Sequence, residues 1–283
     1  MTLKQAKQRL IDQLDIISEN PVFEATEILL FALKIKREEI LYLQNQELTN
    51  RQIRAIKKCF AKRKRGVPLQ YILGEWEFYS LNFKVGKGVL IPRGDSELLV
   101  DLALEEIDRN EKKTVFDFCS GSGAIGIAIA KNRPNVKAVL VEKSSKAFRY
   151  LKDNIRLNAN ESENINIKAL RQDVFKFTPK EKADIIVCNP PYIDKTHMLD
   201  LQKEVRKEPR QALFGGNDGL KYYRMLLKNI EKFLKPDGKL MVEIGYNQGA
   251  EVAQIFKDAG LKDIQVIKDL AQKDRVVFGT LKM

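Results

Sequence analysis

Two segments of this sequence carry residue types that could bind and position a small ligand. The first is a loop that directly follows the apolar run VFDF and comprises Cys119, Ser120, Gly121, Ser122 and Gly123. Glycines let the backbone turn sharply and approach a ligand, and the helix expected after them would present unpaired N–H groups. The loop therefore predicts a site for a nucleotide-like ligand.

An acidic residue follows the loop at the spacing that a nucleoside site requires. The next predicted strand, KAVLVE, ends at Glu142, about twenty residues beyond the loop, where a carboxylate can accept hydrogen bonds from both hydroxyls of a ribose. The glycines from Gly121 to Gly126 also match G-x-G-x-x-G, so a nicotinamide dinucleotide is a second candidate ligand.

The second segment is Asn189-Pro190-Pro191-Tyr192, which directly follows the strand-like run ADIIVC. The two prolines favour extended backbone, which leaves the Asn189 side-chain oxygen and the Pro190 carbonyl as acceptors. Tyr192 adds an aromatic face on which a planar group can stack. Such a site suits a flat NH₂ group, either a carboxamide or the exocyclic amine of a base.

A nitrogen of this kind is a weak nucleophile because its lone pair is delocalised. Two acceptors would stabilise the positive charge that develops when it attacks, and alignment would supply much of the rate. A methyl sulfonium is an electrophile that such a nitrogen could attack without prior deprotonation. Hydride transfer has no use for this tetrapeptide, so the dinucleotide interpretation is the weaker one.

The composition limits other kinds of chemistry. The sequence has one histidine, His197, and three cysteines without a C-x-x-C spacing, so it offers neither a multi-histidine metal site nor a disulfide framework. We expect Cys119 and Cys188 to pack inside the fold and His197 to lie in a loop. No metal is predicted.

Charge and hydropathy indicate the kinds of partner and the cellular compartment to expect. There are 50 Lys and Arg against 38 Asp and Glu, and the net charge of +12 attracts polyanions without specifying one. No apolar run approaches the roughly 18 residues of a membrane helix, and the segment MTLKQAKQRLIDQ lacks the apolar part of a secretion signal. We expect a cytoplasmic protein without a membrane partner.

The elements that position the two segments fall into three regions. Residues 1–70 are predicted to form a helical bundle, because apolar residues recur at helical spacing and because two pairs match the capping box. These pairs are Thr2 with Gln5 and Thr49 with Gln52. Residues 71–92 are predicted to form a β-hairpin connector, with Gly86-Lys87-Gly88 as its turn and Val89–Ile91 as its second strand.

Residues 93–283 alternate short apolar runs with helical patterns, which is typical of a mostly parallel sheet covered on both faces. The runs are Val115–Phe118, Ala138–Val141, Ile185–Cys188 and Leu240–Ile244. The segments DIQVIKDL and RVVFGTL are expected to pair as an antiparallel hairpin at the sheet edge. The predicted fold class is α/β, a Rossmann-like sheet with a small helical bundle in front of it.

A basic run in the last helix of the bundle has two interpretations. It is either a solvated helix face, since cations are favoured near a helix C-terminus, or a docking surface for an anionic partner. The run consists of Lys57, Lys58, Lys62, Arg63, Lys64 and Arg65.

These motifs together resemble the HemK/PrmC family, the peptide-chain release factor glutamine methyltransferases. NPPY alone is shared with adenine-specific DNA methyltransferases, whereas its combination with the other motifs is specific to the release factor enzymes. The motifs that carry the resemblance are RGVPLQYILGEWEFYSLNFKV, GVLIPRGDSELLV, FDFCSGSGAIGIAIA, NPPYI, EPRQALFGGNDGL, LKPDGKLMVEIGYNQ and DRVV.

The resemblance implies S-adenosylmethionine as cofactor, with S-adenosylhomocysteine as product. By resemblance, loop 119–123 wraps the cofactor, Glu142 binds the ribose, and Asp173 with Val174 flanks the adenine. Asn189 lies between cofactor and substrate. Three residues are implied as catalytic, namely Asn189, Pro190 and Tyr192, and residues 189–192 grip the glutamine side chain.

The implied substrate is the glutamine of the Gly-Gly-Gln motif of release factors, which is methylated on its amide nitrogen. The bundle and hairpin would dock the release factor, and the protein would act as a monomer that does not require nucleic acid. The alternative is an adenine-specific nucleic-acid methyltransferase that uses the same NPPY site.

The chain departs from the family pattern at several places. Cys119 stands where the loop usually opens with glycine, Glu142 where aspartate is commoner, and Val174 where an aromatic residue is commoner. Gly94 loosens the turn before the helix at 97, and Ser96 is expected to cap that helix. These changes leave the chemistry in place and bear on cofactor affinity.

Overall fold

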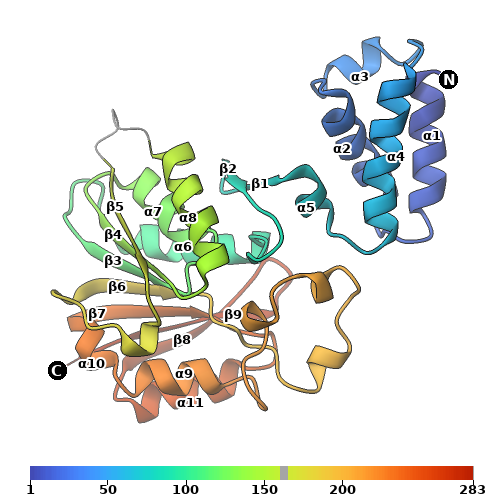
Figure 1. The fold of residues 1–283 in the computed structure, drawn as a ribbon. Helices are drawn as coiled ribbons and strands as arrows, with labels where there is room; N and C mark the ends of the chain where they lie inside the picture. The colour runs from blue at the N-terminus through green and yellow to red at the C-terminus, as the bar shows by residue number, and fades with distance from the viewer. Residues whose placement is uncertain (160–164, 283) are drawn as a thin grey trace. The chain divides into compact units, whose positions relative to one another are not determined.

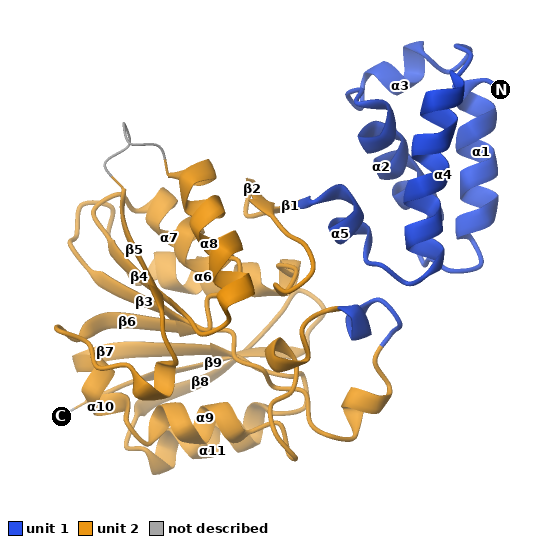
Figure 2. Ribbon diagram, viewed as in Figure 1, with its two compact units in different colours: residues 1–75, 202–207 blue, residues 76–201, 208–283 orange. Residues whose placement is uncertain are grey.

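The computed structural model describes residues 1–159 and 165–282. The chain forms two compact units, which are coloured separately in Figure 2. Unit 1 comprises Met1–Glu75 and Gln202–Lys207, and unit 2 comprises Trp76–Leu201 and Glu208–Met283. No helix among the described residues is long and apolar enough to cross a membrane.

Unit 1 is built from helices, as the capping signals predict. Both capping boxes are formed, and each joins a threonine to the glutamine three residues later. Leucine and isoleucine side chains from α1, α2 and α4 form its core. The helices are α1 (Leu3–Leu14), α2 (Pro21–Leu33), α3 (Glu39–Tyr42), α4 (Asn50–Lys64) and α5 (Leu69–Leu73).

Arg63 differs from the rest of the basic run because it is buried, with 5% of its surface exposed. Its Nε and Nη2 donate to the carboxylate of Glu24 at 2.6 and 3.0 Å, and its Nη1 donates to Glu204. Neither interpretation of the run holds for Arg63, because it is buried and paired with Glu24 and with Glu204, which lies 141 residues away in the chain. Lys57, Lys58, Lys64 and Arg65 are exposed.

Unit 2 contains a seven-stranded sheet in the order β5-β4-β3-β6-β7-β9-β8, which confirms the Rossmann-like prediction. Only β9 is antiparallel to its neighbours on both sides, and β8 and β9 form the expected terminal pair. The strands are β3 (Thr114–Phe118), β4 (Lys137–Glu142), β5 (Asn166–Arg171), β6 (Ala183–Cys188), β7 (Leu234–Glu243), β8 (Lys262–Lys268) and β9 (Asp274–Thr280).

Helices cover both faces of the sheet, with α6 to α8 on one side and α9 to α11 on the other (Figure 1). Two apolar clusters fill the layers between helices and sheet. The helices are α6 (Glu97–Glu105), α7 (Ala124–Asn132), α8 (Ser145–Asn158), α9 (Lys221–Leu227), α10 (Ile230–Phe233) and α11 (Gly249–Asp258).

The hairpin exists, but its predicted turn was wrong. It is formed by β1 (Glu75–Phe78) and β2 (Leu81–Lys84), and residues 86–92 form a loop. Tyr79 and Ser80 make the turn with φ of 51° and 57°, the conformation of a type I′ turn. Turns of this type favour glycine or asparagine, so the sequence pattern missed it. The Glu97 carboxylate accepts from the Tyr79 N–H at 2.8 Å and holds the turn in place.

The buried position of Arg63 leads to a stability prediction. Arg63→Ala would leave the half-buried carboxylates of Glu24 and Glu204 without their cation, so we expect the free energy of unfolding to fall by about 3 kcal/mol. Urea denaturation followed by circular dichroism measures this loss. Lys64→Ala, at the exposed neighbouring position, is the control and should change stability by less than about 0.5 kcal/mol. Equal losses in the two variants would show that the ion pairs do not stabilise unit 1.

Candidate active site

The two chemical segments meet because their strands are neighbours in the sheet. Phe118, the last residue of β3, pairs with Val141 of β4 on one side and with Cys188, the last residue of β6, on the other. The glycine loop and Asn189 therefore leave the sheet side by side at its carboxyl edge. The chain leaves β3 toward β4 on one side and leaves β6 toward β7 on the other, and open α/β sheets bind ligands at such a point.

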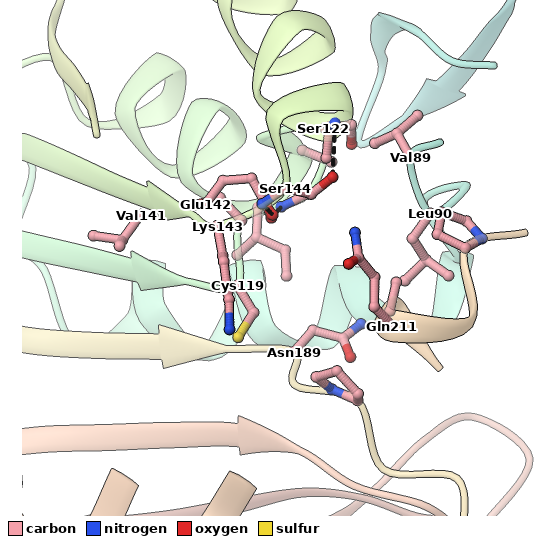
Figure 3. A pocket seen from close by; sticks show the side chains of 18 of the residues that line it. Val89, Leu90, Cys119, Ser122, Val141, Glu142, Lys143, Ser144, Asn189 and Gln211 are labelled. Carbon is pink, nitrogen blue, oxygen red and sulfur yellow. Dashed lines mark hydrogen bonds between the residues drawn. The ribbon is translucent and has the colours of Figure 1, made fainter. Parts of the chain in front are cut away.

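A cavity of about 1130 Å³, counted with its opening to solvent, lies at this edge (Figure 3). Most of the predicted site residues line it, namely Cys119, Ser120, Gly121, Ser122, Glu142, Asp173, Val174, Asn189 and Pro191. Gly123, Pro190 and Tyr192 are not among its lining residues. Tyr192 instead contacts Glu243, which accepts from the lining residue Asn189, and Gly123 packs closely on α8.

The glycine loop needs its glycines for two different reasons. Gly121 and Gly123 have φ of 57° and 85°, in the left-handed region that favours glycine. A Cβ on Gly123 would also lie 2.4 Å from the Leu151 side chain, so the close packing of the loop on α8 excludes any other residue there. Cys119 has φ of 59° and occupies the same left-handed region with a side chain, at a cost of about 1 kcal/mol.

Glu142 closes the loop from the end of β4. Its Oε2 accepts from the Gly121 N–H at 2.8 Å, and its Oε1 accepts from the Ser144 N–H at 2.5 Å. Burial raises the pKa of Glu142, and these N–H groups oppose that effect. Each carboxylate oxygen keeps a further lone pair, so the residue can still accept hydrogen bonds from the hydroxyls of a ribose in the cavity.

An aromatic wall completes the nucleoside side of the cavity. Phe175 and Tyr222 line it with ring centroids 5.5 Å apart, and neither was identified as a site residue from the sequence. Asp173 lies beside them and pairs with Lys143 at 2.8 Å; burial raises its pKa, but the bonds from Lys143 and from the Phe175 N–H lower it overall. The aromatic surface that Val174 lacks is thus supplied by its neighbour and by a residue of α9.

Below Asn189 lies a buried polar network that the sequence did not indicate. Glu243, at the end of β7, accepts from the Asn189 Nδ2 at 2.8 Å and from the Tyr192 hydroxyl at 3.3 Å. The Ser96 hydroxyl also donates to Glu243, so the expected helix cap is wrong and no cap hydrogen bond is formed. Burial raises the pKa of Glu243 to about 7, although hydrogen bonds and Arg275 oppose the rise.

A second buried carboxylate holds the opposite wall. Glu208 is 5% exposed, and it accepts from the Ile91 N–H at 3.0 Å and from the Arg93 side chain. Ile91 and Arg93 both line the cavity, and the segment expected as a strand is a loop in which the Ile91 N–H bonds this carboxylate instead of a neighbouring strand. Gln211, from the turn that follows Glu208, points its amide into the cavity in Figure 3 and was not identified from the sequence.

Of the remaining candidates, Cys188 is buried in the core and His197 lies in an exposed turn, where its ring contacts Asp194. Both positions agree with the sequence expectation of packing and loop residues.

The fold and this cavity define a Rossmann-like methyltransferase. Residues 95–219 match the family model of the methyltransferase small domain, and residues 2–74 match the PrmC N-terminal domain. Two solved structures share the fold at low identity. A methyltransferase from Pyrococcus furiosus superimposes with a TM-score of 0.53 and 17% identity, and covers 83% of this chain and 100% of its own. The hMettl16 catalytic domain gives a TM-score of 0.57 and 13% identity over 82% of each chain.

Curated relatives narrow the class. The release factor glutamine methyltransferase of Thermodesulfovibrio yellowstonii is 40% identical over 259 residues, 90% of this chain and 91% of its own. That of Clostridium acetobutylicum is 37% identical over 285 residues and 98% of each chain. The chain belongs to the release factor glutamine methyltransferase family, which confirms the resemblance found in the sequence.

Asp117, beneath the glycine loop, gives rise to a pH-dependent stability. It is buried; its Oδ2 accepts from the Gly126 N–H at 3.0 Å, and its Oδ1 has no hydrogen-bond partner among the described residues. Burial raises its pKa from 3.8 to about 8. Between these values the folded protein keeps a proton that the unfolded chain loses, so the free energy of unfolding falls as pH rises.

Asp117→Asn should therefore flatten this pH dependence. Urea denaturation at about pH 5 and about pH 8 measures how far the free energy of unfolding falls between these pH values. We expect the fall in the unaltered protein to exceed that in the variant by at least about 1 kcal/mol. Asp153→Asn, in an exposed position on α8, is the matched control and should follow the unaltered protein. A variant with an unchanged decline would mean that Asp117 titrates normally.

Proposed function

We propose that this protein transfers the methyl group of S-adenosylmethionine to the side-chain amide nitrogen of the glutamine in the Gly-Gly-Gln motif of a peptide-chain release factor. The observation that carries the proposal is the cavity in which Glu142, the aromatic wall and Asn189 come together. Family membership supports the same activity, because the relatives bear this name.

The residues that line the cavity fit the proposed cofactor. S-adenosylmethionine supplies an electrophilic methyl group when bound. Glu142 offers acceptors for the ribose hydroxyls, Phe175 and Tyr222 offer a face for the adenine, and the loop residues from Cys119 to Ser122 line the space for the remainder. The aromatic faces favour a planar base, and the carboxylate favours a diol, so both ends of an adenosine are matched.

Asn189 and Pro190 would hold the substrate nitrogen. The oxygen of the Asn189 side chain and the main-chain carbonyl of Pro190 would accept its two hydrogens and so fix the direction of its lone pair. As the N–C bond forms, the C–S bond breaks and the nitrogen becomes positively charged, and the two acceptors stabilise that charge. A proton then leaves the nitrogen for solvent. These chemical steps need no histidine side chain, which agrees with the composition of the chain.

The protein around this site would serve the delivery of a large substrate. We assign residues 1–70 and the connector over 71–92 to docking the release factor, and residues 93–283 to methyl transfer. The protein would act as a monomer in the cytoplasm, without nucleic acid.

The test of the activity is transfer of label. Incubation with methyl-labelled cofactor and a bacterial release factor should label the factor, and mass spectrometry should place one methyl group on the glutamine of the Gly-Gly-Gln peptide. A factor with that glutamine replaced is the control and should stay unlabelled. If DNA or RNA is labelled instead, the adenine-specific alternative is correct; a factor that remains unlabelled while the cofactor binds would refute the proposed substrate.

The role of Asn189 predicts a separable defect. Asn189→Ala removes one of the two acceptors, so kcat should fall by about 10²-fold or more, while cofactor affinity changes much less. Single-turnover methylation and calorimetric cofactor binding measure the two quantities. His197→Ala, in the exposed turn beyond the motif, is the control and should retain both. A near-normal kcat in Asn189→Ala would remove Asn189 from the mechanism.

A further inference from the structure

An asparagine side chain has two ends of nearly the same shape, and only one of them can receive an NH₂ group. If Asn189 presented its own NH₂ group to the cavity, two donors would face each other and the substrate nitrogen would lose an acceptor. The proposed function, on which this inference rests, therefore requires something to fix the orientation of the amide.

The network below Asn189 supplies that orientation. The Nδ2 atom donates to Glu243 Oε2 at 2.8 Å and to Ser96 Oγ at 3.1 Å, so both of its hydrogens are used. The Oδ1 atom is left without a partner among the described residues, and Asn189 lines the cavity (Figure 3).

Glu243 is the residue that fixes which end of the Asn189 amide faces the network. It is 1% exposed and receives donors from three sides, which are Asn189, the Ser96 hydroxyl and the Tyr192 hydroxyl. An ionised carboxylate can only accept hydrogen bonds, so the amide must turn its nitrogen toward it. The Ser96 hydroxyl donates to Glu243 and accepts from Asn189, so it favours the same orientation of the Asn189 amide.

We propose that Glu243 is the positioning residue that turns the Asn189 oxygen toward the substrate, and that the orientation is lost when Glu243 takes up a proton. The buried negative charge also polarises the amide through its N–H, which strengthens the Asn189 oxygen as an acceptor. Glu243 acts through Asn189 and touches neither the substrate nor the methyl group.

The pKa of Glu243 lies in the neutral range because some features of its surroundings raise it and others lower it. Burial raises its pKa to about 7; the Ser96 bond, Arg275 and the Tyr192 bond oppose the rise, and Asp95 adds to it. The other titratable groups that face this end of β7 are Arg93, beside Tyr192, and the buried Cys188 and Tyr223.

The neutral acid carries an O–H donor, which suits the oxygen end of the amide. Protonation would therefore allow Asn189 to turn over and present its NH₂ group to the cavity. The rate of methyl transfer should fall as pH drops below about 7, because the ionised form is the one that orders the site.

The experiment compares pH profiles of single-turnover methylation for the unaltered protein and Glu243→Gln, which keeps the shape but has no proton to titrate. The unaltered protein should show an acid limb with a midpoint near 7. Glu243→Gln should lose that limb, and its rate on the alkaline side should be lower by about 10-fold, with cofactor affinity retained. A variant that keeps the acid limb or the full rate overturns the proposal.

Two further variants separate positioning from structure. The Tyr223 hydroxyl donates to the main-chain oxygen of Glu243 at 2.8 Å, so Tyr223→Phe should lower thermal stability and leave the pH profile unchanged. Tyr192→Phe removes a hydrogen bond that lowers the Glu243 pKa, so its acid limb should move to higher pH. An unmoved limb in Tyr192→Phe, or a moved one in Tyr223→Phe, would contradict the assignment.

A spectroscopic measurement keeps the test independent of the substrate. The side-chain ¹⁵N resonance of Asn189, identified by its loss in Asn189→Ala, should shift with a midpoint near 7 in the unaltered protein and stay constant in Glu243→Gln. Failure to label any release factor would refute the proposed function alone, whereas a constant resonance in the unaltered protein would refute the role of Glu243.

Discussion

The site depends on the pairing of β3 with β6 in one parallel sheet. Since Phe118 and Cys188 are partners at the ends of these strands, the glycine loop and Asn189 begin at the same height on the same edge. Parallel strands must be joined by crossovers, so these segments are about seventy residues apart in the chain and still adjacent in space. Without that register, neither half of the cavity would face the other.

Buried carboxylates then organise the walls of the cavity. Glu142 holds the glycine loop, Glu208 holds the segment from Ile91 to Arg93, and Glu243 holds Asn189. Each accepts N–H or O–H donors that would otherwise be unsatisfied, which offsets the cost of burying the charge. The elevated pKa of Glu243 shows that the offset is incomplete, and this is why the residue can respond to pH near neutrality.

Sequence reasoning succeeded where the physical cause is local. The capping boxes at Thr2 and Thr49 formed because their partners lie three residues away, and the parallel strands β3, β4, β6 and β7 were recognised as short apolar runs, whereas the less apolar β5 was not. It failed where a distant group decides the outcome. The hairpin turn at Tyr79 is held by Glu97, and Ser96 gives its hydroxyl to Glu243 instead of capping α6.

The sequence by itself determined the glycine loop, the NPPY tetrapeptide, the fold class and the family, because these signals are written in consecutive residues. Only the tertiary structure decided which side chains hold them. Glu243 lies 54 residues from Asn189 and 147 from Ser96, and Glu208 lies 117 from Ile91. No local propensity favours such contacts, since they form only when the sheet and its helices have packed and left a buried carboxylate in need of donors.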